Sequence, residues 1–267
     1  MIAKTYSIVA EFGDFCRFAG GVLLRALSWR GLGPGRAFRQ RVYAQLYDIG
    51  LKSVPVVMIT GAFVGMTLAV QSYVQFKGIG LEDHLGSVIN ISVLRELGPV
   101  LAAVMLAGRV GGAMTAELGT MKVTEQIDAY RVMGTDPVRL LVLPRFIACV
   151  LLTPLLIVYT DVMGVFGGYA VSCWQFGVNS EAYWSFSAVV EKYDLFTGMA
   201  KGLMFGALIA LIACYHGFTC DRGAQGVGKA CTEGFVLSFL ANLSSNYVMS
   251  VFFKTIYETF YEVKIVL

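Results

Sequence analysis

Residues 146–172 read FIACVLLTPLLIVYTDVMGVFGGYAVS, and Asp161 is the only charged side chain among them. A transmembrane helix needs about 20 mostly apolar residues, so this stretch is long enough to cross a bilayer. Four further segments have the same character: 54–76, 96–117, 196–216 and 234–254. The sequence therefore predicts an all-α membrane protein with five transmembrane helices, which we interpret as a single integral-membrane domain over residues 1–267.

The composition excludes several classes of protein. Hydrophobic residues make up 57% of the 267 residues and charged residues only 15%, whereas a soluble domain carries about 25% charged residues. A soluble enzyme and a disordered chain therefore fit poorly. A net charge of +3 is too small to indicate a nucleic-acid partner. The six cysteines form no CxxC pair, so we expect no zinc site and no other metal or cofactor.

Residues 4–27 differ from the five spans because their charged side chains gather on one face of a helix. The rest of this helix is largely aliphatic or aromatic. Such a pattern predicts an amphipathic helix that lies in the membrane interface. Packing of this helix on the protein's own bundle is the alternative.

Lysine and arginine are distributed unequally between the loops. They gather before the first span, between the second and third, and between the fourth and fifth, while the other loops hold fewer. Cytoplasmic loops carry the excess of basic residues in membrane proteins. We therefore expect the N-terminus in the cytoplasm and the C-terminus on the opposite side of the membrane.

Small and polar residues recur every four positions within the spans. The pairs Gly61/Gly65 and Gly164/Gly168 are typical of helices that pack closely in a bilayer. Thr67, Gln71 and Gln75 form a polar stripe on the first span. Helix packing and the lining of a polar cavity are both consistent with this stripe.

Charged residues inside the spans are the strongest indication of a functional site, because ionisable groups in a bilayer are costly. At 1.5 Å per residue, Arg95, Glu96, Asp161 and Lys201 fall at a similar depth, toward the outer leaflet. This mixed-charge cluster has two interpretations. It binds a zwitterionic or anionic head group, or its members neutralise one another, as Asp161 and Lys201 would.

The segment between the second and third spans, residues 119–145, is amphipathic and mixed in charge. A short surface helix over 123–133 would present Glu125, Asp128 and Arg131 to the cytoplasm, either as a docking element or as part of a solvated loop. A second segment, Gly223–Lys229, has the spacing of a phosphate loop, but alanine follows its lysine where a magnesium-binding hydroxyl is required. We do not expect nucleotide binding there.

One run of residues is distinctive: RELGPVLAAVMLAGR over 95–109, continued by TAELG at 115–119, TEQ at 124–126, Asp136-Pro137 and PRF at 144–146. This run resembles the MlaE/YrbE family, the permease subunits of ABC transporters associated with MCE-domain proteins. The match extends over most of the chain, from the interfacial helix through five spans. The resemblance implies a homodimeric permease in the bacterial inner membrane that moves phospholipid, or a related hydrophobic molecule, between the inner and outer membranes. It implies three partners: an ABC ATPase subunit that hydrolyses ATP, an MCE-domain protein on the periplasmic side and, in some systems, a small STAS-domain protein.

The resemblance also implies roles for particular residues, none of them catalytic. Arg95, Glu96 and Lys201 match charged residues near the lipid-binding cavity of the family, and we add Asp161, Thr67, Gln71 and Gln75 to that candidate set. The segment that corresponds to the family's coupling helix contains five candidate ATPase contacts: Glu125, Gln126, Asp128, Arg131 and Met133. Two other functions remain: an ion- or proton-coupled secondary carrier that uses the membrane charges as a relay, and a structural anchor for a periplasmic assembly.

Overall fold

The computed structural model describes residues 2–27, 36–78, 80–81, 84–187 and 192–260. Within these ranges the regular elements are all helical. Five helical stretches in them are long and apolar enough to cross a membrane: Phe38–Lys77, Leu85–Val123, Val138–Gln175, Tyr193–Thr219 and Ala224–Thr259. The prediction of an all-α membrane protein is confirmed.

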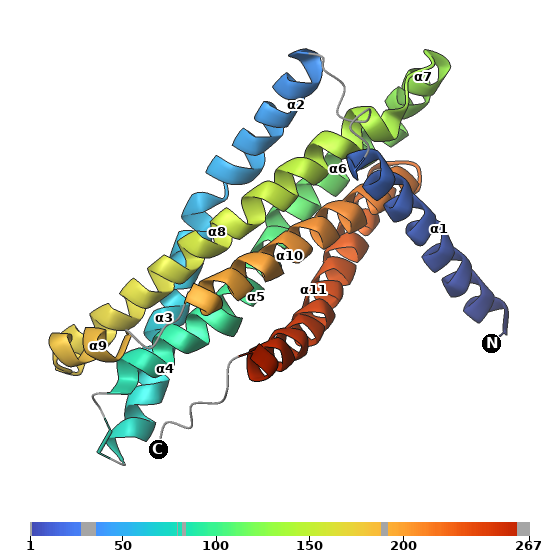
Figure 1. Ribbon diagram of the computed structural model, residues 1–267. Helices are drawn as coiled ribbons and strands as arrows, with labels where there is room; N and C mark the ends of the chain where they lie inside the picture. Colours follow the sequence, from blue (N-terminus) through green and yellow to red (C-terminus); the bar gives the residue numbers. More distant parts are fainter. Residues whose placement is uncertain (1, 28–35, 79, 82–83, 188–191, 261–267) are drawn as a thin grey trace. The chain divides into compact units, whose positions relative to one another are not determined.

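Eleven α-helices are described (Figure 1): α1 Ile2–Leu27, α2 Arg36–Leu46, α3 Val54–Lys77, α4 Leu85–Ser92, α5 Gly98–Leu106, α6 Gly112–Val123, α7 Gln126–Val132, α8 Leu143–Ala170, α9 Ser180–Ser187, α10 Lys192–Thr219 and α11 Ala224–Phe260. Five π-helical turns join or extend them: η1 Tyr47–Leu51, η3 Val93–Leu97, η4 Ala107–Gly111, η5 Val138–Val142 and η6 Val171–Gln175. Because η1 joins α2 to α3 with only a short turn, the helical stretch that contains the predicted 54–76 span begins well before residue 54. Residues 261–267, which the prediction placed on the outer side, lie outside the described part.

The chain divides into two compact units. Unit 1 consists of Met1–Ser53, Leu106–Leu152 and Gly206–Phe239, and unit 2 of Val54–Met105, Thr153–Phe205 and Leu240–Leu267. The division falls within α8, α10 and α11, so each of these helices contributes residues to both units.

In unit 2, the close approach of α3 to α8 requires glycine. A Cβ atom at Gly61 would overlap the carbonyl oxygen of Thr160, and one at Gly65 would overlap that of Gly164. The predicted role of the Gly61/Gly65 pair in tight packing is thereby confirmed.

Helices α4 and α9 lie side by side in the same unit (Figure 1). They enclose the buried ring of Tyr183, whose hydroxyl donates to Asn90 Oδ1 at 3.1 Å. Burial raises the pKa of Tyr183 above its usual value, so the hydroxyl remains a donor.

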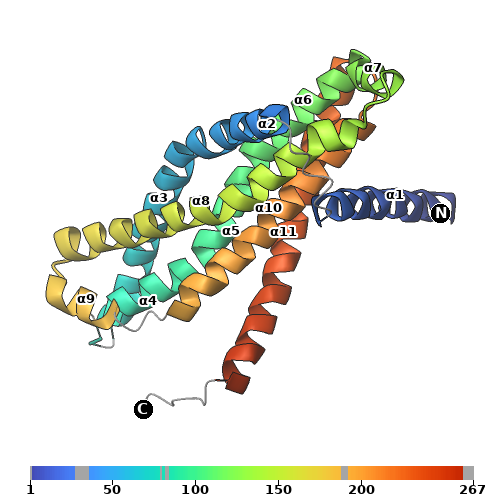
Figure 2. The same ribbon diagram turned by 45° about the horizontal axis from the view of Figure 1, so that its top comes forward.

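In unit 1, α1 contacts the C-terminal half of α10 (Figure 2). The rings of Phe15 and Tyr215 lie 5.4 Å apart in an edge-to-face arrangement. The C-terminal part of α1 is held by an ion pair of 2.9 Å between Arg25 and Asp136. The apolar side of α1 is only partly covered, since Phe12, Leu24 and Leu27 are exposed. The predicted amphipathic helix over 4–27 is therefore present, and part of its apolar face packs on the protein itself.

Candidate functional site

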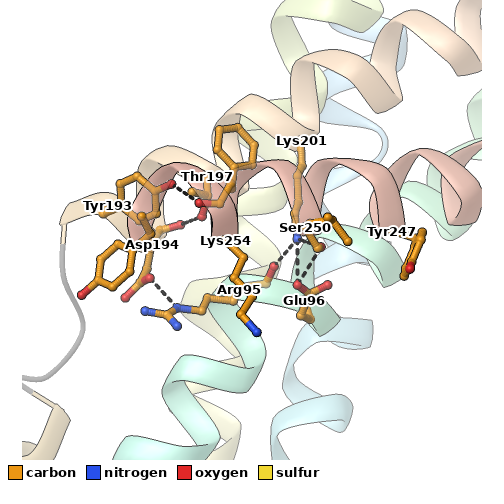
Figure 3. Close-up of a pocket in the computed structure, with 12 residues that line it drawn as sticks. Arg95, Glu96, Tyr193, Asp194, Thr197, Lys201, Tyr247, Ser250 and Lys254 are labelled. Carbon is orange, nitrogen blue, oxygen red and sulfur yellow. Dashed lines mark hydrogen bonds and ion pairs between the residues drawn. The ribbon is translucent and has the colours of Figure 1, made fainter. Parts of the chain in front are cut away.

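A pocket of about 330 Å³ in unit 2 brings together most of the predicted membrane charges (Figure 3). Its charged lining residues are Arg95, Glu96, Asp194, Lys201 and Lys254. Aromatic and hydroxyl side chains complete the wall, among them Tyr193, Thr197, Tyr247, Ser250 and Tyr257.

Three elements supply these side chains: one π-helical turn and two α-helices. The π-helical turn η3 carries Arg95 and Glu96, and such turns occur frequently at functional sites. Helix α10 presents Asp194, Thr197 and Lys201, which are spaced three and four residues apart and so share one face. Helix α11 presents Asn246, Ser250, Lys254 and Tyr257 in the same way.

Lys201 is the centre of a hydrogen-bond network and its side chain is only 2% exposed. Its ammonium group donates to the backbone oxygen of Arg95 at 2.7 Å, to Glu96 Oε1 at 3.0 Å and to Ser250 Oγ at 2.8 Å. An ammonium group has three N–H donors, so all the donors of Lys201 are used within the protein.

Glu96 completes the same network from the other side. The Ser250 hydroxyl donates to Glu96 Oε1 at 2.8 Å, and Asn246 Nδ2 donates to Glu96 Oε2 at 2.9 Å. The Glu96 side chain is 46% exposed, in contrast to its buried partner Lys201. The acid and the base neutralise each other. Lys201 has no donor left for a ligand, whereas Glu96 Oε2 accepts only from Asn246 and keeps one acceptor position.

Arg95 is held differently. Its Nε donates to Asp194 Oδ1 at 2.5 Å, and Asp194 is 1% exposed while Arg95 is 44% exposed. Within the described part of the chain, the two terminal nitrogens of Arg95 form no hydrogen bond or ion pair. Asp194 therefore fixes the guanidinium from one side and leaves its outer fork open to the pocket (Figure 3).

Lys254 is the third cation of the pocket. Its ammonium lies 3.8 Å from Glu258 in an exposed ion pair, and such pairs contribute little free energy. Lys254 can therefore turn to a ligand at low cost. The outer nitrogens of Arg95 and the ammonium of Lys254 are the donors that this pocket offers to an anion.

The remaining predicted lipid-site residues lie in unit 2 but do not line this pocket. Asp161 is buried on α8 against the backbone of Gly98, and its Oδ1 has no hydrogen-bond partner among the described residues. Lys201 pairs with Glu96 and not with Asp161. Gln71 and Gln75 are exposed on α3. Thr67 donates to the backbone of the preceding turn and lines a separate, largely apolar pocket.

The predicted coupling residues lie together in unit 1, in α7 and at the residues that flank its two ends (Figure 2). Helix α7 begins at Gln126 because Glu125 has a left-handed backbone with φ of 59°. It is therefore shorter than the predicted 123–133 helix. Arg131 and Asp128 form an ion pair of 2.9 Å on its surface, and Met133 follows its end. Ile127 is buried, whereas Val132 is 89% exposed.

Sequence reasoning missed Asp194, Asn246, Ser250 and Lys254 as members of the site. One signal was present in the sequence: polar residues recur every four positions at Asn246, Ser250 and Lys254. This spacing predicts one polar face on α11. Asp194 precedes Lys201 by seven residues, a spacing that places both on one face of α10.

Comparison with known proteins gives consistent matches. The profile of the permease MlaE family matches residues 42–252. A probable ABC transporter permease protein of Rickettsia conorii is 43% identical over 215 residues, which cover 80% of this chain and 83% of that protein. The intermembrane phospholipid transport system permease protein MlaE of Haemophilus influenzae is 35% identical over 208 residues, covering 77% and 80% of the two chains. The chloroplastic protein TRIGALACTOSYLDIACYLGLYCEROL 1 of Arabidopsis thaliana is 36% identical over 236 residues, covering 88% and 66%.

Proposed function

This chain belongs to the MlaE permease family and is an ABC transporter permease, and on that premise we propose that it moves phospholipid between the inner and outer membranes of a bacterium. The pocket around Arg95 is the single observation that carries the proposal, because it joins an open cationic group to an apolar, membrane-spanning fold. The relative in Haemophilus influenzae carries the name of a phospholipid transport permease.

The size and chemistry of the pocket suit a head group better than a whole lipid. A volume of about 330 Å³ lies at the lower end of the range for small-molecule sites. The planar fork of arginine matches the oxygens of a phosphate group, and Asp194 holds that fork in place. In this proposal the phosphate contacts Arg95 and Lys254, while Glu96 and Lys201 keep η3, α10 and α11 together.

The segment around α7 is the proposed contact for the ATPase subunit. Val132 and Met133 expose apolar side chains beside the charged pair of Asp128 and Arg131. Exposed apolar groups rimmed by polar ones are typical of surfaces that bind another protein. In the proposed mechanism, closure of the ATPase moves α7, and the permease transmits this motion to the lipid site.

The proposed assembly follows the family resemblance. Two copies of the chain form the permease in the inner membrane, with the N-terminus in the cytoplasm and the C-terminus in the periplasm. An ATPase subunit binds each copy on the cytoplasmic side, an MCE-domain protein binds on the periplasmic side, and a STAS-domain protein is a further candidate partner. Thr67, Gln71, Gln75 and Asp161 remain candidate cavity residues in this assembly.

The test begins with purification of the chain from its native membrane in mild detergent, followed by mass spectrometry of the proteins and lipids that accompany it. The complex is then placed in vesicles of phosphatidylethanolamine and phosphatidylglycerol, and ATP-dependent transfer of a fluorescent phospholipid is measured. We expect Arg95→Gln to lower transfer at least about tenfold, since a hydrogen bond to a charged group contributes about 1.5–3 kcal/mol. Arg17→Gln is a matched control, because Arg17 is an exposed arginine on α1.

Two results would contradict the proposal. One is transport that continues without ATP and follows the pH gradient or the membrane potential, as a secondary carrier would show. The other is normal lipid transfer by the Arg95→Gln and Lys254→Gln variants, even though an ATPase and a lipid are recovered with the chain. That result would show that this pocket does not bind the transported lipid.

A further inference from the structure

Unit 1 contains a second polar pocket, of about 490 Å³, to which no role has yet been assigned. Its polar lining residues are Gln45, Asp48, Lys52, Arg109 and Glu117. All five belong to stretches that are long and apolar enough to cross a membrane. Lys52 precedes the predicted span 54–76 and Glu117 ends the span 96–117, so we expect the pocket at the membrane boundary; Arg109 lies within a span, where a charged group is costly.

Three of the four charged lining residues pair with an opposite charge, and the fourth has no such partner among the described residues. Asp48 pairs with Lys52 one helical turn away. Glu117 pairs at 2.8 Å with Arg145, which is 4% exposed. Arg109 donates to the Ser53 hydroxyl and forms no ion pair with any described residue. Among the residues that the structure describes, Arg109 is therefore the lining cation without a countercharge.

The backbone around Arg109 is also unusual. Arg109 lies in the π-helical turn η4, and Asp48 and Ile49, which also line the pocket, lie in the π-helical turn η1. Such turns insert a residue into a helix, change the direction of the following side chains and occur often at functional sites. The pocket around Arg95 shares this feature, since Arg95 and Glu96 lie in η3.

The geometry points to a second anion-binding site in this pocket, which takes the phosphate group of an anionic membrane lipid through the guanidinium of Arg109. An arginine without an acidic partner in a membrane-spanning stretch is stabilised by a phosphate oxygen, which supplies both charge and hydrogen-bond acceptors. Basic pockets between membrane helices bind lipid head groups in this way. Ile49, Val110 and Met114 complete the wall as buried apolar side chains, so in this proposal the head group enters the pocket and the acyl chains stay outside it.

A lipid accounts for the lining better than a free anion does. A site for free phosphate would gain from Lys52 as a second cation, but the Asp48 carboxylate beside Lys52 balances its charge and would repel a free anion that approached both. Glu117 is likewise held by Arg145, so it does not oppose the ligand with an unbalanced charge. The single remaining positive charge matches the single negative charge of a phosphodiester.

The experiment uses the purified complex in nanodiscs of phosphatidylcholine that contain a photoactivatable phosphatidylglycerol. After illumination, the labelled residues are mapped by mass spectrometry of peptides. We expect labelling in residues 45–52 and 109–117 of the unaltered protein, and a loss of about tenfold in Arg109→Gln, as for other charged hydrogen bonds. Ser53→Ala removes the hydroxyl partner of the Arg109 guanidinium but keeps the guanidinium itself, so labelling should remain. If Arg109 had only a structural role, Ser53→Ala and Arg109→Gln should reduce the labelling equally.

The controls separate this site from the one in unit 2. Arg17→Gln, at an exposed arginine of α1, should not change the labelling of 45–52 and 109–117, and neither should Arg95→Gln. Competition by excess inorganic phosphate would identify a soluble anion as the occupant and overturn the lipid assignment. The lipid assignment would also be overturned if these segments of the unaltered protein were not labelled. The same holds if they were cross-linked only to a partner protein.

Discussion

The pair of Glu96 and Lys201 should respond asymmetrically to substitution, because its two members are buried to very different degrees. Glu96→Gln removes the countercharge of an ammonium that is 2% exposed. Removal of one partner from a buried ion pair costs about 3–5 kcal/mol, and we expect about 3 kcal/mol here since Arg95 O and Ser250 Oγ still accept from Lys201.

Lys201→Met should cost less, about 1–2 kcal/mol for the lost hydrogen bonds. The carboxylate that remains is 46% exposed, so water reaches it, and Asn246 and Ser250 still donate to it. Methionine also fills the volume of the lysine stem. The double variant should be less destabilised than the sum of the two, by at least about 1 kcal/mol, as for residues in direct contact.

The free energy of unfolding of the four proteins, measured in mixed micelles under identical conditions, gives the complete double-mutant cycle. Retained insertion and a single peak in size-exclusion chromatography are the requirements for including a variant. Equal costs of the two single substitutions, or a larger cost for Lys201→Met, would refute the reasoning from exposure. Additive costs would refute the ion pair itself.

Three further predictions concern packing, backbone and pH. Gly65→Ala should cost about 2 kcal/mol or more, since its Cβ would overlap the backbone of α8, whereas Gly13→Ala, with nothing within 4 Å, should be neutral or stabilising in the same thermal unfolding assay. Glu125→Gly should stabilise the fold by up to about 1 kcal/mol, because glycine adopts the left-handed backbone of this position without strain. If Glu125 contacts the ATPase, the same substitution should lower the stimulation of ATP hydrolysis by lipid. The raised pKa of Tyr183 means that the folded state keeps a proton which the unfolded state loses above about pH 10. Stability should therefore fall more steeply above pH 10 in the unaltered protein than in Tyr183→Phe, and equal slopes would contradict this.

The sequence predicted the helical architecture and the grouping of Arg95, Glu96 and Lys201, because depth along a span follows directly from residue spacing. It could not predict which acid pairs with which base. That choice depends on the rotation of each helix about its axis, which places Asp161 against Gly98 and Lys201 beside Glu96. The π-helical turns were equally invisible, since no residue type marks them, although they carry Arg95 and Arg109.

The network in unit 2 also decides which substitutions can report on lipid binding. All the donors of Lys201 are occupied and Glu96 is bound through both oxygens, so charge reversal at either residue breaks the contacts between η3, α10 and α11. Loss of transport in such variants would therefore follow from an altered fold as readily as from a lost ligand contact. Arg95 is the better probe where a cation is kept beside the buried Asp194, because its outer nitrogens form no hydrogen bond or ion pair with the described residues. Arg95→Lys keeps the charge but loses the planar fork. If phosphate binds there, this conservative change should weaken the binding of lipid while leaving the free energy of unfolding almost unchanged.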